Sequence, residues 1–405
     1  MGGDQLENPN LNEFYQSLIR PQSLSESQLT INSNQVAGHA GFFSLRDDPG
    51  CCLKPFNVKC VRGRREHLFY QIIEHFKRNT SLRELSTDGI SENNLNTSYS
   101  YDQITLLKYP ETKCNCVVDE SLIKLLSPFI ANFYHVRYLE LENENSPKRL
   151  DDFLRSVYSE NLSCPCYGRD PVEKLSCSRD FKRVNFLCLE DLTAHCQEPC
   201  IIDIKIGRIT YDPMAIKEKV LEQSSKYKRL REFGFRVLGM KLKGAIKDKS
   251  YGKSLETSDQ ILEALNCFFL PLSKREYKIA VIGKILNRIG SLLSIFEGKN
   301  INQLKFFSSS LLIVYDSFVM DQHKSLSSIQ SDLAESVRVS MIDFAHVFHI
   351  HDEIHEGSSL AHLQGKDYNY IFGLRKLEHF LLELNRQHYS HPQDLHFRHP
   401  ELLQP

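Results

Sequence analysis

The sequence predicts an α+β fold, and two observations carry this prediction. Short segments with the apolar or alternating pattern of strands are mixed with longer segments that place apolar residues at helical spacing. The two kinds of segment do not alternate strictly, which disfavours a doubly wound parallel sheet. A chain of 405 residues is long enough for two or three domains, or for one two-lobed unit with insertions. The apolar share of 41% is enough for a sizeable core.

The composition excludes several classes of protein. Lys and Arg total 50 and Asp and Glu total 51, so the net charge of −1 argues against a protein that binds nucleic acid through bulk basic charge. No apolar run reaches the roughly 18 residues of a membrane span. The start, MGGDQLENPN, lacks the basic and apolar regions of a secretory signal. We therefore expect a monomeric protein of the cytoplasm or nucleus, with no transmembrane segment and with its 12 cysteines as reduced thiols.

The amino-terminal part of the chain is expected to hold a flexible arm and a first structural unit. Residues 1–33 are rich in Asn, Ser and Gln, with apolar residues scattered singly, which is typical of an arm without a core. The first unit, 34–190, is predicted to contain strands over 36–45 and 51–54, a helix over 66–78 that Glu66 opens, and a packed segment over 119–139.

Two polar stretches interrupt that first unit. Residues 79–117 and 142–180 are rich in Asn, Ser, Thr and Glu and show neither helical nor strand periodicity. Long polar segments between packed elements run over the protein surface. We therefore predict both stretches to be surface insertions in a smaller fold.

The second unit, 191–386, is predicted to be richer in helices. Asp212 followed by Pro213 is a good helix start, and Gly234 is a helix stop, so one helix is predicted over 213–233. The other predicted helices are 257–270, 276–297 and 368–386, the predicted strands are 184–192, 199–207, 235–243, 304–316 and 337–348, and the tail 387–405 is predicted to be irregular.

The segment 199–207, PCIIDIKIG, carries the first candidate chemistry. On a strand, Asp203 and Lys205 share one face, and three isoleucines occupy the other. A carboxylate beside an ammonium suits phosphoryl transfer, because the ammonium neutralises phosphate oxygens while the carboxylate orients a hydroxyl. An ordinary ion pair on an amphipathic strand gives the same pattern, so both interpretations stay open at this point.

Two further patterns point in the same direction. Along the predicted helix 213–233, Lys219, Gln223 and Lys226 follow one stripe, which could hold several phosphates of a polyanion or could be an ordinary solvated face. Asp343 lies in the apolar run MIDFAH, where an unpaired carboxylate would be costly to bury. Mg²⁺ in phosphotransferases is held by one or two carboxylates and by nucleotide phosphates, whereas a structural aspartate at a turn is the alternative.

These motifs together resemble the inositol polyphosphate kinase family. The resemblance rests on their order: P-x-x-x-D-x-K-x-G at 199–207, then Ser309-Ser310-Leu311-Leu312, then Ile342-Asp343-Phe344. Further matches are Gln35–His39, Glu190–Leu192, Tyr211–Pro213, Gly239-Met240 and Tyr251–Leu255. The resemblance covers about 34–76 and 184–386, and within the family it is greatest to the multikinase branch.

The resemblance implies a role for each matching residue. It implies ATP-binding roles for Lys54, Glu66, Glu190, Leu192, Asp203, Ser310 and Asp343. It implies contacts with the inositol phosphate for Lys205, Lys219, Gln223, Lys226 and His346. Asp203 and Lys205 would be the catalytic pair, and Asp343 would hold the magnesium ion.

The same resemblance implies a fold and an activity. The expected fold has two protein-kinase-like lobes, an added inositol-binding helical segment and surface insertions. The expected activity is transfer of the γ-phosphoryl group of ATP, with Mg²⁺, to hydroxyls of inositol tris- or tetrakisphosphate, a phosphoinositide lipid being a further possible substrate. An inositol hexakisphosphate kinase, or a kinase-like scaffold that binds inositol phosphates without turnover, is the alternative.

Two positions depart from the pattern of the family. Asn34 stands where a histidine is common, and Glu222 stands where the multikinase branch often has a second glutamine. An acidic side chain beside a bound polyphosphate is repulsive. Glu222 is therefore expected to affect the choice of acceptor.

Overall fold

We analysed a computed structural model of the chain, which describes two sheets and the helices that cover them. The described residues are 22–32, 34–36, 42–56, 58, 61–85, 120–140, 183–211, 215, 217–243, 245–298, 304–322, 336–349 and 365–389. Most of the two predicted insertions, 86–117 and 142–180, lies outside these ranges, as do residues 1–21 of the predicted arm and the tail beyond 389.

The first sheet is built from the amino-terminal part of the chain. Its six strands lie in the order β1-β5-β6-β4-β3-β2. They are β1 (Gln22–Leu24), β2 (Leu29–Ile31), β3 (Phe43–Leu45), β4 (Cys51–Phe56), β5 (Phe133–Glu140) and β6 (Arg183–Glu190), with a 3₁₀ turn, η1 (Glu26–Gln28), between the first two. All neighbouring pairs are antiparallel except β1 with β5.

The prediction of a flexible arm over 1–33 is wrong for its last third, because β1 and β2 belong to this sheet. The single apolar residues that suggested an arm are the inward-facing positions of the two short strands. Leu24 and Leu29 are buried in a small core with Phe43 and Phe186. Strands of three residues bury one or two side chains each, so they leave little periodicity in the sequence.

Helix α2 (Val61–Leu85) packs beside this sheet and is longer than the predicted 66–78. It begins five residues before Glu66, which therefore does not open the helix, and it takes in the first residues of the predicted insertion at 79–117. Arg65, which precedes the predicted start, is buried with its guanidinium 4.0 Å from the centre of the Phe348 ring. This contact with a distant segment extends the helix beyond what its apolar spacing indicates.

The second sheet comes from the carboxy-terminal part of the chain. Its order is β12-β11-β7-β8-β9, and all its pairs are antiparallel. The strands are β7 (Pro199–Ile206), β8 (Phe235–Leu242), β9 (Ala245–Lys247), β11 (Ser310–Asp316) and β12 (Val337–Ile342). A separate pair is formed by β10 (Leu304–Phe306) and β13 (Val347–His349).

The predicted strands 304–316 and 337–348 are thus each split in two. Each break holds a residue with a positive φ, namely Ser308 (57°) and Asp343 (65°). Such a conformation is uncommon for residues other than glycine and bends the chain away from the strand direction. Both bends lie close to the motifs that the sequence singled out.

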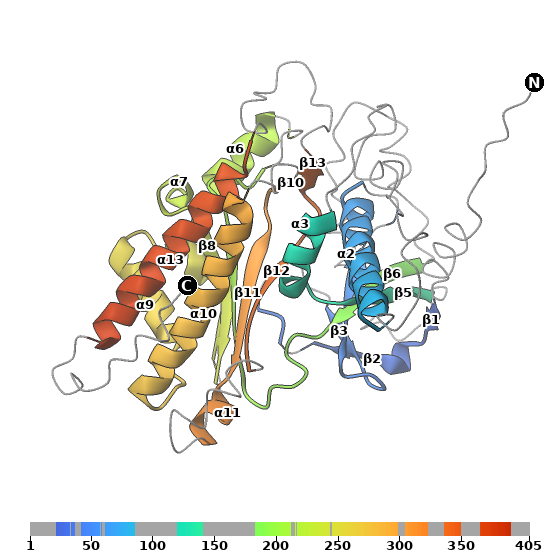
Figure 1. Ribbon diagram of the computed structural model, residues 1–405, viewed down its shortest axis with the longest axis horizontal. Coiled ribbons are helices and arrows are strands. Elements are labelled where there is room, and N and C mark those ends of the chain that lie inside the picture. Colours follow the sequence, from blue (N-terminus) through green and yellow to red (C-terminus); the bar gives the residue numbers. More distant parts are fainter. Residues whose placement is uncertain are drawn as a thin grey trace, which may run out of the picture.

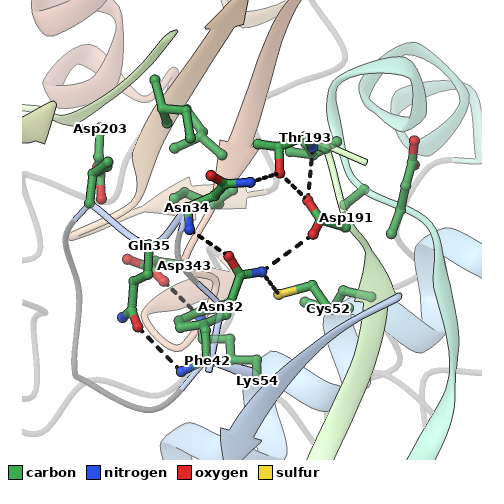
Figure 2. A pocket seen from close by; sticks show the side chains of 18 of the residues that line it. Asn32, Asn34, Gln35, Phe42, Cys52, Lys54, Asp191, Thr193, Asp203 and Asp343 are labelled. Carbon is green, nitrogen blue, oxygen red and sulfur yellow. Dashed lines mark hydrogen bonds and ion pairs between the residues drawn. The ribbon is translucent and has the colours of Figure 1, made fainter. Parts of the chain in front are cut away.

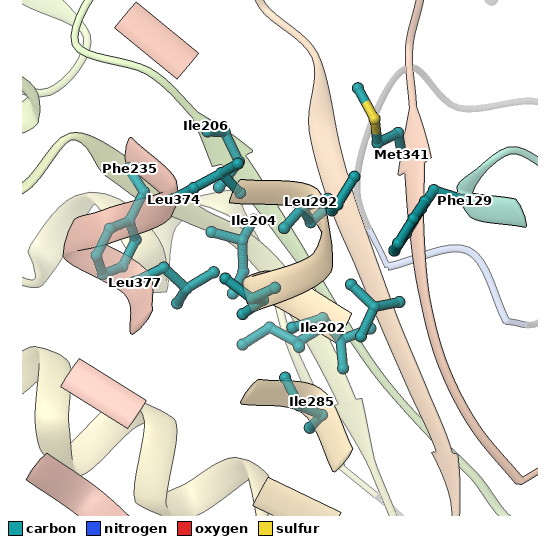
Figure 3. Close-up of a cluster of buried hydrophobic side chains, with 14 of the residues drawn as sticks. Phe129, Ile202, Ile204, Ile206, Phe235, Ile285, Leu292, Met341, Leu374 and Leu377 are labelled. Carbon is teal, nitrogen blue, oxygen red and sulfur yellow. The ribbon is translucent and has the colours of Figure 1, made fainter. Parts of the chain in front are cut away.

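Helices cover one face of this second sheet. Figure 1 shows α10 (Arg275–Glu297) and α13 (Tyr368–Tyr389) side by side along it, with α9 (Ser258–Phe268) nearby. The three isoleucines of β7, Ile202, Ile204 and Ile206, are fully buried in the core that these helices complete (Figure 3). The smaller helices are α3 (Glu120–Leu126), α8 (Lys249–Ser254), α11 (Ser317–Gln322) and the 3₁₀ turn η5 (Ser127–Phe129).

Helix α10 has the length and composition of a membrane-spanning helix, with a mean hydropathy of 1.6 over its most apolar window. It is the only such helix in the described part of the chain. More than half of that window, 56%, is buried against the rest of the protein. Its apolar character therefore has a sufficient explanation in the core, and the search gives no further evidence of a span.

The helix predicted over 213–233 is interrupted. The structure has α6 (Lys217–Ser225) and a single turn, α7 (Leu230–Phe233), with Lys226 in the bend after α6. Tyr227 turns inward, and its hydroxyl donates to the carbonyl of Leu255. The stop at Gly234 is confirmed, since this glycine has a φ of 69° and caps α7. The predicted start, Asp212-Pro213, lies outside the described residues.

Candidate active site

A pocket lies where the two sheets meet, and both sheets contribute to its wall (Figure 2). The first sheet supplies Cys52 and Lys54 from β4, and the second supplies Asp203 from β7 and Asp343 from the end of β12. The segment after β6, which connects the two sheets, supplies Glu190 to Thr193. Residues remote in the sequence are therefore brought together, as in a site for a ligand held between two lobes.

A chain of three charged side chains, those of Glu66, Lys54 and Asp343, lies at the pocket. The Lys54 Nζ lies 2.7 Å from Glu66 Oε1 on α2 and 2.7 Å from Asp343 Oδ1. Burial alone would lower the pKa of Lys54, but the carboxylates of Asp343 and Glu66 hold that pKa well above its ordinary value. The lysine therefore remains charged, and its position is fixed from both sheets.

Asp343 is held in its unusual backbone conformation by its neighbours. The Ser309 hydroxyl donates to the Asp343 carbonyl, at 2.9 Å. The next amide, that of Phe344, donates to Glu66 Oε1 at 3.1 Å, and the Phe344 ring packs 4.4 Å from that of Phe69. Strained backbone persists where the surroundings over-determine it, and such residues gather at functional sites. The Asp343 carboxylate is thereby directed into the pocket.

Asp203 faces the same pocket from β7. Its side chain is only 3% exposed, and its Oδ1 has no hydrogen-bond partner among the described residues. Burial, together with the charge of Asp343, raises the pKa of Asp203 to about 7, while Lys205 opposes the shift. A buried carboxylate oxygen without a partner is costly, and a hydroxyl or a metal ion would satisfy it.

Lys205 lies two positions further along β7, on the same face as Asp203, as the strand pattern predicted. It does not line the pocket itself, and its Nζ donates to the Ser308 carbonyl (2.9 Å) and hydroxyl (2.6 Å). Burial lowers the pKa of Lys205 to about 8. Ser310, its cross-strand neighbour on β11, is fully buried and also lies outside the pocket wall.

The connecting segment holds two of the predicted residues, Glu190 and Leu192, and both line the pocket. The Glu190 carboxylate is engaged by Arg338 and by the amide of Asn132, and its own amide donates to the Asn132 carbonyl. These contacts anchor the segment to both sheets. Leu192 supplies apolar surface, which suits a flat ring.

Four lining residues, Asn32, Asn34, Asp191 and Thr193, form a polar network that the sequence did not predict. The Asp191 carboxylate accepts from the Thr193 hydroxyl (2.6 Å) and from the Asn32 amide (3.3 Å), and Asn34 donates to the Thr193 hydroxyl (2.8 Å). Lys241 of β8 donates to the Asn34 side-chain oxygen at 2.6 Å. Asn34 thus ties the amino-terminal segment to the second sheet. In the sequence, Asn34 had stood out only because it replaces a histidine that is common in the family.

Gly239 permits that same segment to approach β8. A Cβ at this position would lie 2.2 Å from the carbonyl oxygen of Val36, so no other residue fits without displacement of the backbone. The pocket is consequently closed on this side by residues 34–36.

The predicted substrate residues of α6 lie apart from the pocket wall. Lys219 and Lys226 both pair with Glu222, at 2.8 and 2.9 Å, and these two lysines lower the pKa of Glu222 to about 2. Gln223 is half-buried on the same helix. The carboxylate of Glu222 therefore lies between the two lysines and forms an ion pair with each of them.

His346 lies in the turn between β12 and β13, and its carbonyl accepts from the Phe307 amide. It is not part of the pocket wall. The structure brings Lys54, Glu66, Asp203 and Asp343 together and places Lys205 and Ser310 directly beside them. His346 and the predicted substrate residues Lys219, Gln223 and Lys226 lie outside the pocket wall.

The residues of the pocket fit a nucleotide and a divalent ion. Lys54 is a fixed cation for phosphate oxygens, and the carboxylates of Asp203 and Asp343 are hard oxygen donors that face the same pocket. No cluster of three or more metal-ligating side chains occurs among the residues that the structure describes. Two carboxylates and the phosphates of a nucleotide form the ligand set that Mg²⁺ ordinarily takes in phosphotransferases.

Comparison with known proteins identifies one family. Residues 186–382 match the family model described as inositol polyphosphate kinase. The human inositol polyphosphate multikinase is 41% identical over 140 residues, which are 32% of this chain and 32% of that protein. Human inositol hexakisphosphate kinase 2 is 29% identical over 253 residues, 56% of this chain and 57% of that protein.

The aligned regions are partial. The chain spans about a third of the length of the curated multikinases it matches. The crystal structure of the inositol phosphate multikinase from S. cerevisiae in complex with ADP and Mn²⁺ is 24% identical and aligns with a TM-score of 0.38, over 49% of this chain and 84% of that one. The matched region contains Asp203, Lys205, Ser310 and Asp343 in their family motifs. Residues 186–382, just under half of the chain, therefore match the inositol polyphosphate kinase family.

Proposed function

We propose that this protein is an ATP- and Mg²⁺-dependent inositol polyphosphate kinase of the multikinase type. It would transfer the γ-phosphoryl group to hydroxyls of inositol tris- and tetrakisphosphate. One observation carries the proposal: a lysine fixed between Glu66 and Asp343 shares its pocket with a second carboxylate, Asp203, whose buried Oδ1 has no hydrogen-bond partner among the described residues. This arrangement supplies both positive charge for phosphates and oxygen donors for a metal ion.

In this proposal, the residues of the pocket bind the nucleotide and its metal ion. Lys54 would contact the phosphates of ATP, and the apolar wall at Leu192 would receive the adenine. Asp343 would hold Mg²⁺, with Asp203 close enough to share in its binding. When bound, the ion neutralises charge on the phosphate that is transferred.

In this proposal, Asp203 and Lys205 at the end of β7 act on the acceptor and on the phosphoryl group that is transferred. Asp203 would accept a hydrogen bond from the attacking hydroxyl and orient it, and Lys205 would neutralise charge that develops on the transferred group. The Ser308 contacts keep the Lys205 Nζ in place. Phosphoryl transfer depends mainly on such positioning and charge neutralisation, so no further general base is required.

The phosphates of the acceptor would be held by Lys219, Gln223 and Lys226, with His346 as a further contact. Glu222 bridges the two lysines in the free protein. A phosphate that binds there competes with this carboxylate, because both are anions for the same ammonium groups. Acceptor binding is therefore expected to be weaker than an unopposed pair of lysines would give.

A hexakisphosphate kinase that makes inositol pyrophosphates is the second candidate. It is favoured by the longer alignment, since hexakisphosphate kinase 2 matches 56% of this chain whereas the multikinase matches 32%. The multikinase has the higher identity over the aligned residues, 41% against 29%. The two candidates differ in the product, a new monoester against a diphosphate.

The test is a product analysis. Purified protein is incubated with Mg-ATP and either inositol 1,4,5-trisphosphate or inositol hexakisphosphate, and the products are separated by phosphate number. Stepwise tetrakis- and pentakisphosphate would support the multikinase proposal, and a diphosphate product from hexakisphosphate would favour the second candidate. No product from either substrate would contradict both and favour a scaffold without turnover.

A further inference from the structure

The hairpin of β8 and β9 gathers lysines at the edge of the second sheet. The stretch 241–253 contains five lysines and a single acid, whereas the whole chain has a net charge of −1. Strand β9 is the outermost strand of its sheet, and all three of its residues are exposed. The single acid, Asp248, is occupied at the start of α8, where its carboxylate accepts from the amides of Ser250 and Tyr251. This edge therefore presents a local excess of positive charge to solvent.

An exposed isoleucine lies among these lysines. Ile246 is 61% exposed, and Lys247 follows it on the strand. The side chain of Lys243, in the turn between the two strands, is 58% exposed and pairs with Glu198 at 2.8 Å. Surface pairs of this kind contribute little to stability and exchange readily. A single exposed apolar residue is ordinary on a protein surface, but here the apolar side chain projects from a surface of cations.

The register of the second sheet relates this edge to the pocket. Ile246 is the direct partner of Lys241, which is in turn the direct partner of Ile201 on β7. Directly opposed residues of antiparallel strands project from the same face of the sheet. Ile201 and Asp203 both line the pocket, so Ile246 projects from the face of the sheet that the pocket uses. Lys241 also reaches towards the pocket, because its Nζ donates to the side chain of Asn34 at 2.6 Å.

We infer that this edge, with Lys243, Ile246 and Lys247, docks on the surface of an anionic lipid bilayer and turns the pocket face of the second sheet towards the membrane. The inference goes beyond the proposed function, which concerns phosphoryl transfer to a soluble acceptor. Charge complementarity selects the partner, because lysines close to a membrane are attracted by anionic headgroups. The exposed isoleucine favours a bilayer over a soluble polyanion or a nucleic acid, since a bilayer also offers an apolar region just below its charged surface.

The test measures binding of the full chain to vesicles by co-sedimentation at low salt. The vesicles contain phosphatidylcholine alone or phosphatidylcholine with phosphatidylserine, and a short DNA duplex serves as a competing polyanion. The variants are K243Q/K247Q and I246S. The matched control is L125S, because Leu125 is 50% exposed and follows an exposed lysine, Lys124, on a helix that carries no other lysine. Turnover of soluble inositol 1,4,5-trisphosphate is measured for each variant.

The wild type should bind the anionic vesicles and leave the neutral ones unbound. K243Q/K247Q should lower the partition coefficient about 25-fold, which is about fivefold for each lysine. I246S should lower it about tenfold through loss of the apolar contact, and L125S should bind as wild type does. Turnover of the soluble acceptor should stay unchanged in all three variants.

Three results would overturn the inference: equal binding of the wild type to neutral vesicles, unchanged vesicle binding in K243Q/K247Q, or DNA that binds the protein more tightly than the anionic vesicles do. A parallel loss of turnover in K243Q/K247Q would also overturn it, because these lysines would then serve the acceptor site. Each of these results leaves the proposed function intact as long as the wild type turns over the soluble acceptor. Vesicle binding by a wild type without turnover would support the inference and contradict the proposed function alone.

Discussion

The pocket and the stripe of α6 both hold lysines whose charge is compensated by carboxylates, but the two arrangements differ in exposure. In the pocket, Lys54 lies between Glu66 of α2 and Asp343, with only 15% of its side chain exposed, and these two contacts fix its charge in place. On α6 and in the bend after it, Lys219 and Lys226 are partly exposed and share Glu222, which is itself half exposed. The first arrangement is fixed before any ligand arrives, whereas the second can be rearranged by the ligand.

This difference fits two distinct tasks. A nucleotide phosphate that must be transferred needs a rigid cation, because a small displacement of the reacting groups costs a large part of the rate. An acceptor that carries several phosphates needs exchangeable contacts, and exposed ion pairs contribute little to stability and are easily replaced. We therefore expect substitutions in the pocket to alter turnover and substitutions on α6 to alter acceptor affinity.

The largest effect is expected for D343N. The amide keeps the shape of the side chain but removes the charge that would hold Mg²⁺, so kcat should fall about 10²- to 10³-fold, the usual cost of losing one electrostatic contribution in a transition state. The rate is measured over a Mg²⁺ titration. Near-normal turnover would show that Asp343 does not bind the metal ion.

Lys54→Met tests whether the buried charges depend on one another. It leaves Glu66, which is 5% exposed, without its lysine, and removal of one partner of a buried pair costs about 3–5 kcal/mol of unfolding free energy. Urea denaturation measures this loss. The double variant K54M/E66Q should recover part of the stability without recovering activity, and a single variant as stable as wild type would contradict the coupling.

Lys219→Ala tests the exposed region. It removes one cation of α6, so the KM for inositol 1,4,5-trisphosphate should rise about tenfold while the KM for ATP and the stability stay near wild type. Steady-state kinetics with each substrate varied in turn provides the comparison. Equal increases in both KM values would place this lysine in the nucleotide site.

The pH dependence of kcat/KM tests the end of β7. Burial raises the pKa of Asp203 to about 7 and lowers the pKa of Lys205 to about 8, and the reaction needs the carboxylate ionised and the lysine protonated. Activity should therefore be greatest between pH 7 and 8 and fall about tenfold per unit beyond each limit. R236Q should move the alkaline limb to higher pH, because the charge of Arg236 lowers the pKa of Lys205. A flat profile from pH 6 to 10 is the contradictory result.

The smallest effect is expected for E222Q. Loss of the carboxylate frees both lysines for the acceptor, so the KM for inositol trisphosphate should fall about two- to fivefold at low salt, in the range of exposed ion pairs. The advantage should shrink at high ionic strength because the pairs are exposed. A rise in KM would show that Glu222 itself contacts the acceptor.

The sequence predicts the α+β fold and much of the pocket, because the motifs are local. The alternation around Asp203 and Lys205 specifies a strand face, and the structure places both residues on the face opposite the buried isoleucines. The roles of Lys54 and Glu66 at the nucleotide site were expected from the family resemblance alone. No spacing in the sequence relates β4 to α2.

Other features depend on contacts that spacing does not reveal. The break between α6 and α7 follows from the inward turn of Tyr227 towards Leu255, and the bridge made by Glu222 depends on side-chain geometry. The position of Arg236 opposite Lys205 depends on the register of β7 and β8, which is known only once the strands are paired. These features could not be predicted because each joins residues through tertiary structure.

The central claim is that the buried and the exposed cations serve different phosphates. The most direct test measures Mg-ADP and inositol 1,4,5-trisphosphate binding by calorimetry for the wild type, K54M and K219A/K226A. The account predicts a crossed pattern, in which K54M loses nucleotide binding alone and K219A/K226A loses acceptor binding alone. Loss of both ligands in K219A/K226A, with its fold intact, would contradict the account.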